Sequence, residues 1–177
     1  MLFRSAEVER QASDALELST RQNFATWLPG EVVLRGWARS AAGDTAEGIA
    51  LIENGIGDYR AIGSTICMPY YLALKAEALH LADRTSEAVE AIREALVMAE
   101  ISEERWWCAE LHRLHGVFLA TMGVDETQIE ASFSAAVRMA IEQKSVSLER
   151  RAEGTYAEYR RQKASGSGGR GFLLPLW

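Results

Sequence analysis

Apolar side chains recur at intervals of three and four residues along most of the chain, which is the period of an amphipathic helix. One such stripe is formed by Ala88, Ile92, Ala95, Leu96 and Ala99. The pattern predicts helices over residues 4–23, 28–42, 45–61, 67–82, 86–101, 106–122, 127–143 and 146–162. The predicted fold class is therefore all-α.

The predicted helix boundaries carry residues that start or stop helices. Pro29 and Pro69 fall in first turns, where a missing N–H costs nothing because that group has no partner inside the helix. Gly43 suits the end of a helix. Asp44 with Glu47 three residues later resembles a capping box, with Asp in place of Ser or Thr. These signals predict helix pairs joined by short turns.

The chain also resembles itself when it is shifted by 40 residues, with one residue inserted near 124–127. The aligned sets include Trp27, Cys67 and Trp107; Leu34, Leu74 and Leu114; Gly36, Ala76 and Gly116; and Gly43, Asp83 and Gly123. Such a period predicts a stack of antiparallel helix pairs, a solenoid. We expect a helical repeat domain over residues 1–163, made of a partial unit 1–24, units 26–64, 65–104 and 105–144, and a final helix 145–163. Residues 164–177 are then a Gly/Ser linker and an apolar tail.

Small residues recur inside these units in a way that resembles tetratricopeptide repeats. Gly36 is followed by Gly48 and Gly55, and the same steps separate Ala76, Ala88 and Ala95. Small side chains at these positions allow the two helices of a pair to approach closely. The unit is 40 residues long instead of about 34, no proline ends it, and Arg39 stands where the consensus prefers an aromatic residue.

Three segments carry a more specific resemblance: WCAELHRLHG over residues 107–116, LRGWA over 34–38 and SLE over 147–149. They resemble the tetratricopeptide-type C-terminal region of large bacterial signalling proteins, multidomain ATPases with adenylate-cyclase or transcription-factor modules at the other end. The resemblance covers residues 1–160 and implies protein–protein interaction or effector sensing, without catalysis. The chain starts in what resembles the second helix of a unit, which indicates either a short stand-alone relative or a piece of a longer solenoid.

Composition narrows the function classes. The 177 residues carry a net charge of −6, which disfavours a nucleic-acid partner, since such binders present a basic face. No apolar stretch approaches the roughly 20 residues that span a bilayer, so we expect no membrane partner. Two cysteines, Cys67 and Cys108, fit a reduced cytoplasmic protein better than a disulfide scaffold.

Chemistry-bearing residues are few. His112 and His115 lie three apart on one helix, with Cys108 and Glu110 nearby, but two ligands on one helix need a third from elsewhere. His80 is expected near the opposite end of the neighbouring helix. The Gly-rich run 166–171 lacks the preceding strand and the Gly-Lys-Ser/Thr of a phosphate loop. We therefore expect no catalytic residue, no metal and no cofactor.

A partner surface is predicted from the geometry of helix-pair repeats, whose first helices line a concave face. Residues of those helices outside the packing stripe are Trp37, Tyr70, Glu77, His80, Glu110 and Arg113. Aromatic and charged anchors suit a protein or peptide partner. The alternative for Trp37 is that it packs between helices.

The tail places five large apolar residues, Phe172, Leu173, Leu174, Leu176 and Trp177, after a Gly/Ser-rich spacer. Burying them would contribute on the order of 5 kcal/mol before ordering costs. We expect the tail to dock on the final helices or on another chain, and a homodimer through the tail or a solenoid end is one such arrangement. The rival view is a disordered end.

Three functions remain. The first is a non-catalytic interaction or regulatory scaffold with an exposed groove, and the second is a sensor that binds a small effector in the concave groove, which needs an enclosed pocket. The third is an enzyme built on His112, His115 and Glu110, which needs those groups to converge. The sequence favours the first.

Overall fold

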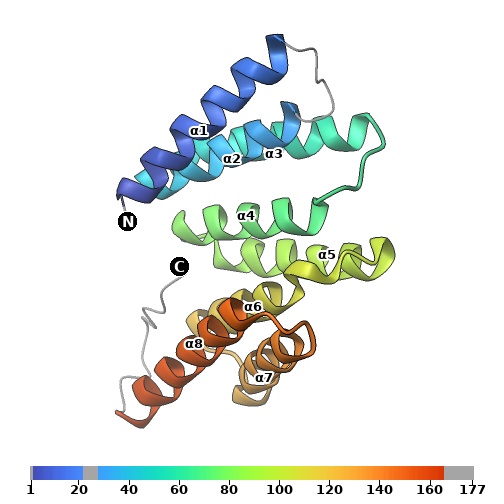
Figure 1. The fold of residues 1–177 in the computed structure, drawn as a ribbon. Helices are drawn as coiled ribbons and strands as arrows, with labels where there is room; N and C mark the ends of the chain where they lie inside the picture. Colours follow the sequence, from blue (N-terminus) through green and yellow to red (C-terminus); the bar gives the residue numbers. More distant parts are fainter. Residues whose placement is uncertain (1, 22–27, 166–177) are drawn as a thin grey trace. The chain divides into compact units, whose positions relative to one another are not determined.

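A computed structural model of the chain describes residues 2–21 and 28–165. Across them the chain is all-α, with eight α-helices and one short 3-10 helix, coloured along the sequence in Figure 1. The elements are α1 (Leu2–Arg21), α2 (Leu28–Ala42), α3 (Thr45–Ala61), α4 (Met68–Leu81), α5 (Thr85–Ser102), η1 (Arg105–Trp107), α6 (Cys108–Met122), α7 (Glu126–Glu142) and α8 (Val146–Ala164). The predicted helices are confirmed to within two residues, except that the sixth begins as the turn η1.

The chain divides into two compact units, Met1–Ala91 and Ile92–Trp177, and α5 belongs to both. In the first unit α2 and α3 lie side by side, α1 packs on α2, and α4 packs on both α2 and α3 (Figure 1). In the second unit α6 packs against α7 and α8. Among the described helices, none combines the length and the apolar character needed to cross a membrane.

The α2–α3 hairpin is closed by glycines that leave no room for a side chain. A Cβ atom on Gly36 would lie 2.6 Å from the carbonyl oxygen of Gly48, and one on Gly55 would lie 2.6 Å from that of Pro29. The contacts pair rising positions on α2 with falling positions on α3, so the helices are antiparallel. The predicted role of Gly36, Gly48 and Gly55 in close helix approach is confirmed.

The second unit packs its helices through aromatic rings. Gly116 of α6 faces Phe133 of α7, whose ring carbon would lie 2.8 Å from a Cβ on that glycine. The Phe133 ring in turn stacks on the Tyr156 ring of α8, with ring centroids 5.3 Å apart. The ring of Tyr159 is tilted against Phe133, with ring centroids 5.4 Å apart. The small residue in α6 therefore admits a large ring that joins α7 to α8.

The same helix-ending motif recurs along the chain. Gly43, Asp83 and Gly123 all have positive φ angles, of 110°, 60° and 66°. In each case the residue donates to the carbonyl three positions back, and the next residue donates to the carbonyl five positions back. This is the Schellman arrangement, which satisfies carbonyls that the last helical turn leaves without partners. A second series with positive φ consists of Gly63, Glu103 and Lys144, and its last interval is longer by the one residue inserted near 124–127.

Candidate functional site

The predicted partner-binding residues of the first unit lie close together but are not freely exposed. Trp37 of α2 donates from Nε1 to Oε2 of Glu77 on α4 over 2.9 Å. The Glu77 side chain is buried, with 5% of the residue exposed, whereas Trp37 and Tyr70 are half-buried. Burial, followed by the negative charge of Glu77, raises the pKa of Tyr70. A buried carboxylate requires hydrogen-bond donors, and the indole N–H of Trp37 is one of them.

His80 lies one helical turn beyond Glu77, in the last turn of α4, next to the turn that leads into α5. Its Nδ1 lies 3.0 Å from the hydroxyl oxygen of Thr85, the first residue of α5. Burial lowers the pKa of this imidazole, and the charge of Asp83 partly opposes that shift. His80 therefore links the two ends of the turn.

In the second unit, Glu110 and Arg113 form a buried ion pair on α6. Both nitrogens of one edge of the Arg113 guanidinium, Nε and Nη2, donate to the two Glu110 oxygens over 2.9 and 2.7 Å. On the α8 side Nη1 donates to the Thr155 hydroxyl over 3.3 Å, and Arg151 lies 3.3 Å from Glu110. The pair is 1% and 0% exposed, which corrects the expectation that these two residues stand outside the packing.

Glu77 needs the same correction. Partner binding by the six residues stays a prediction: Trp37, Tyr70, Glu77, His80, Glu110 and Arg113. A partner could reach the side chains of only three of them, Trp37, Tyr70 and His80, because the other three are buried. For Trp37 the hydrogen bond to Glu77 favours the alternative interpretation, packing between helices. The physical reason is that α4 and α6 are apolar on nearly all sides, so polar residues on them are buried as well.

His115 of α6 is directed toward α7, whereas Glu110 on the same helix is directed toward α8. The Nδ1 of His115 lies 3.0 Å from the Ser132 hydroxyl on α7, and that hydroxyl donates its proton to the Gln128 carbonyl. His115 Nδ1 is therefore the donor, which fixes the Nδ1–H tautomer. Glu110 instead pairs with Arg113 and with Arg151 of α8, so His115 and Glu110 have different partners on different helices.

The environment of His115 keeps its ring neutral. Burial, together with the charges of Arg93 and His112, lowers the pKa of His115 to about 4. Its Nε2 atom is buried and has no hydrogen-bond partner among the described residues. Burial is also the main cause that lowers the pKa of His112 and that raises the pKa of the Cys108 thiol. Within the described chain, no three His, Cys, Asp or Glu side chains come together as a metal site would require.

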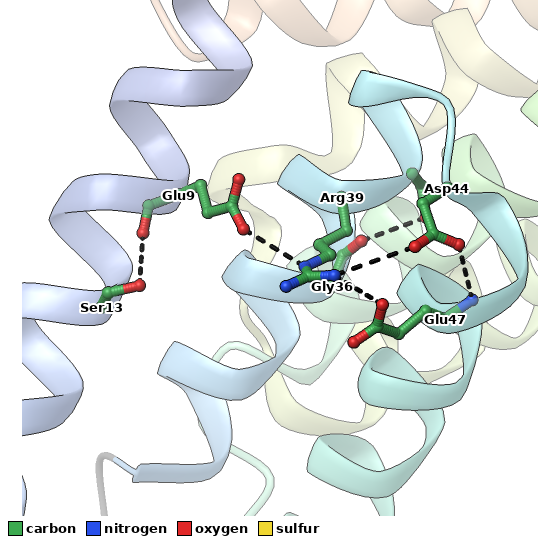
Figure 2. A network of polar contacts seen from close by, with 7 residues as sticks. Glu9, Ser13, Gly36, Arg39, Asp44 and Glu47 are labelled. Atoms are coloured by element: carbon green, nitrogen blue, oxygen red, sulfur yellow. Dashed lines mark hydrogen bonds and ion pairs between the residues drawn. The ribbon is translucent and has the colours of Figure 1, made fainter.

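Arg39 of α2 is the centre of an ionic network in the first unit (Figure 2). Its Nε donates to Glu9 of α1 over 3.2 Å, and its Nη1 donates to Glu47 of α3 over 2.5 Å. Oδ2 of Asp44 lies 3.8 Å from the same Nη1 atom of Arg39. Asp44 also caps α3, because its Oδ1 accepts from the Glu47 N–H over 3.3 Å. The predicted cap is confirmed, but the Glu47 carboxylate pairs with Arg39, which ties α1 to the α2–α3 hairpin.

A concave surface lies between α7 and α8, a groove of about 770 Å³ that sequence reasoning missed. Its walls are lined by Ser134, Val137, Arg138, Ile141, Glu142, Glu153, Tyr156, Ala157 and Arg160. Ile141 is 52% exposed on this surface. The pair Val137 and Ile141, four positions apart on an otherwise polar helix face, is the sequence signal that could have indicated it. We call this surface the α7–α8 groove.

One end of the α7–α8 groove is held by a polar cluster. Tyr156 donates to the Glu130 carboxylate, and the Arg160 guanidinium lies 4.0 Å above the Tyr156 ring and 3.2 Å from Glu130. The predicted docking residues of the tail, Phe172, Leu173, Leu174, Leu176 and Trp177, lie outside the described residues.

Comparisons with known proteins place the chain beside one much longer protein. It is 31% identical over 156 residues to an uncharacterized protein of Rhizobium meliloti (strain 1021), and the alignment covers 88% of this chain. The chain spans about 15% of the length of that relative. No protein-family model matches the chain, and no solved structure matches it.

Proposed function

We propose that the chain is a non-catalytic protein-interaction or regulatory module of the tetratricopeptide type. The support comes first from the helix hairpins. Repeat-equivalent small residues close the α2–α3 pair, and the same Schellman turn recurs at Gly43, Asp83 and Gly123. Stacking of such pairs into a solenoid, as in the signalling proteins that the sequence resembles, is part of the proposal.

The observation that carries the proposal is the α7–α8 groove. Its lining includes the apolar residues Val137, Ile141 and Ala157 and the charged residues Arg138, Glu142, Glu153 and Arg160. An open, mainly apolar groove with lining charges of both signs suits a peptide segment, whose side chains cover the apolar surface while its backbone stays hydrated or bonds to the charged groups. We therefore move the proposed contact from the concave-face residues to this groove.

The alternative, a sensor for a small effector, stays a second proposal. It is favoured by the buried Nε2 of His115, an acceptor that a bound donor could satisfy. A small ligand is usually enclosed on most sides. The test is thermal unfolding in the presence of small molecules that carry a hydrogen-bond donor. A molecule that raises the unfolding midpoint of the wild type but not of His115→Asn would support this alternative.

The proposal is tested by affinity capture with a matched pair of variants. Ile141 and Ile101 are the penultimate residues of α7 and α5, and they are 52% and 72% exposed. Ile141→Asp places a charge in the groove, and Ile101→Asp places the same charge at an equivalent helix position outside it. We expect a cellular protein that wild type and Ile101→Asp retain and Ile141→Asp loses. Equal retention by all three, or retention of nothing, would contradict the proposal.

A further inference from the structure

The α7–α8 groove is large and apolar enough to hold part of another chain. Concave sites of roughly 300–1,000 Å³ bury most of a drug-sized molecule, so the groove of about 770 Å³ has room for several large side chains. Ser134 and Ala157 have small side chains on facing walls. Ile141, at 52% exposed, leaves apolar surface in contact with water, and covering it would be favourable.

The chain itself carries a segment with the matching composition. Residues 172–177 read FLLPLW, with five large apolar side chains in six positions. The described part of the chain ends one residue after α8, which forms one wall of the groove. In the sequence, a Gly- and Ser-rich stretch, residues 166–171, separates this segment from the end of α8.

The linker has the length that this docking needs. An α-helix rises 1.5 Å per residue, so Tyr156 lies about 12 Å along α8 from Ala164. A Gly-rich linker of six residues has a root-mean-square span of about 13 Å. The linker can therefore turn back along α8 and place Phe172 near the middle of the groove without being stretched.

The charged residues that line the groove can bind the backbone of a docked segment that is not helical. Arg138 and Glu142 are 4.0 Å apart and highly exposed, at 70% and 60%, so each keeps hydrogen-bonding capacity on the groove side. Glu153 faces them from α8. Backbone N–H and C=O groups that dock without forming a helix need such partners or water.

We infer that the apolar tail, residues 172–177, docks into the α7–α8 groove of its own chain. A tether of six residues rich in glycine gives the attached segment an effective concentration of the order of mM at a site that it can reach. A second copy at μM concentration competes poorly with that, so docking within one chain is favoured over exchange between copies. A partner protein that binds the groove must then displace the tail. This consequence rests on the proposed function, whereas docking of the tail does not rest on it.

The test is photo-crosslinking in the full chain, with p-benzoylphenylalanine in place of Phe172. We expect a product of single-chain mass whose crosslinks map by mass spectrometry to α7 and α8. Ile141→Asp should lower the yield about fivefold or more, because an unpaired charge in an apolar site is costly. Ile101→Asp, with the same charge outside the groove, should leave the yield unchanged.

A second groove variant, Ala157→Gln, tests the other wall at an exposed position of α8, and circular dichroism verifies that each variant is folded. Crosslinks to other helices, a product of double mass, or a yield insensitive to both groove variants would overturn the inference. Capture of a partner plays no part in this readout, so the proposed function can fail while tail docking stands.

Discussion

The indole of Trp37 on α2 and the carboxylate of Glu77 on α4 are joined by a 2.9 Å hydrogen bond across 40 positions of sequence. This separation equals the interval at which the sequence resembles itself. The bond joins a half-buried aromatic residue to a buried acid and holds α4 against α2. Trp37 and Glu77 are residue types that often bind ligands on an exposed face, but here they bond to each other between two helices.

Replacing Trp37 by Phe should destabilise the protein by about 1–3 kcal/mol, because a charge-assisted hydrogen bond to a buried carboxylate is lost. Urea unfolding followed by circular dichroism measures the change. Trp106→Phe is the control, since Trp106 is 49% exposed. A double-mutant cycle with Glu77→Leu isolates the pair, because leucine offers no acceptor to the indole N–H, and a coupling energy near zero would contradict the assigned bond.

Arg113→Met should be far more costly, at about 3–5 kcal/mol, since it removes the main cation from a fully buried Glu110. Adding Glu110→Leu should restore part of the lost stability, because a buried ion pair can be replaced by apolar side chains of similar volume. The thermal unfolding midpoint measures both effects.

The matched control is Arg84→Met. Arg84 and Glu87 also form an Arg–Glu pair three residues apart, but the two side chains are 44% and 54% exposed. We expect no measurable loss there, since exposed pairs are screened by water. Equal losses at Arg84 and Arg113 would show that burial of the α6 pair does not set its contribution.

Gly36→Ala and Gly57→Ala should have opposite effects. A Cβ on Gly36 would lie 2.6 Å from the Gly48 carbonyl oxygen and 2.8 Å from Ile52, whereas one on Gly57 meets nothing within 4 Å. We expect Gly36→Ala to cost about 1–3 kcal/mol through overpacking. Gly57→Ala should stabilise by about 0.5–1 kcal/mol, because alanine favours helix. Thermal denaturation of the two variants decides, and stabilisation by both would contradict the close hairpin contact.

His115 should make stability depend on pH. Its folded pKa, about 4, lies below the usual value of 6.5. As the pH falls through 6.5 the unfolded imidazole takes up a proton while the folded ring stays neutral, so the free energy of unfolding decreases between pH 6.5 and about 4. His115→Asn, which keeps a donor toward Ser132, should flatten this dependence.

The tautomer offers an independent check. The geometry requires the Nδ1–H form of His115, with Ser132 as acceptor. Nitrogen–proton correlation spectra of the imidazole rings at neutral pH distinguish the two tautomers. A ring protonated at Nε2 would contradict the hydrogen bond, and a ring that titrates near pH 6.5 would contradict the predicted pH dependence.

Helix positions and turns could be predicted because their causes are local. The three-to-four periodicity, Pro29 and Pro69 in first turns, and the Asp44 cap act within a few residues, and the described helices follow them closely. The spacing of Gly36, Gly48 and Gly55 also indicated a close hairpin before any contact was known.

The candidate site was predicted less well. Glu110 and Arg113 were placed on an exposed face, although Ala109, Leu111 and Leu114 around them already indicate a helix that is apolar on all sides. The α7–α8 groove had only the pair Val137 and Ile141 as a signal. Neither the hydrophobic periodicity nor the composition of a helix indicates whether a neighbouring helix covers one of its faces.

By itself, the sequence determined the all-α class, the helix boundaries, the turns and the small residues that close the α2–α3 hairpin. Only the tertiary structure decided which charges are buried, that Arg39 reaches Glu9 on α1, that His115 binds Ser132 while Glu110 faces α8, and that a groove opens between α7 and α8. The reason is range. Backbone propensities act over one helical turn, whereas burial and ion pairing depend on side chains that packing brings together from 17 to 42 positions apart.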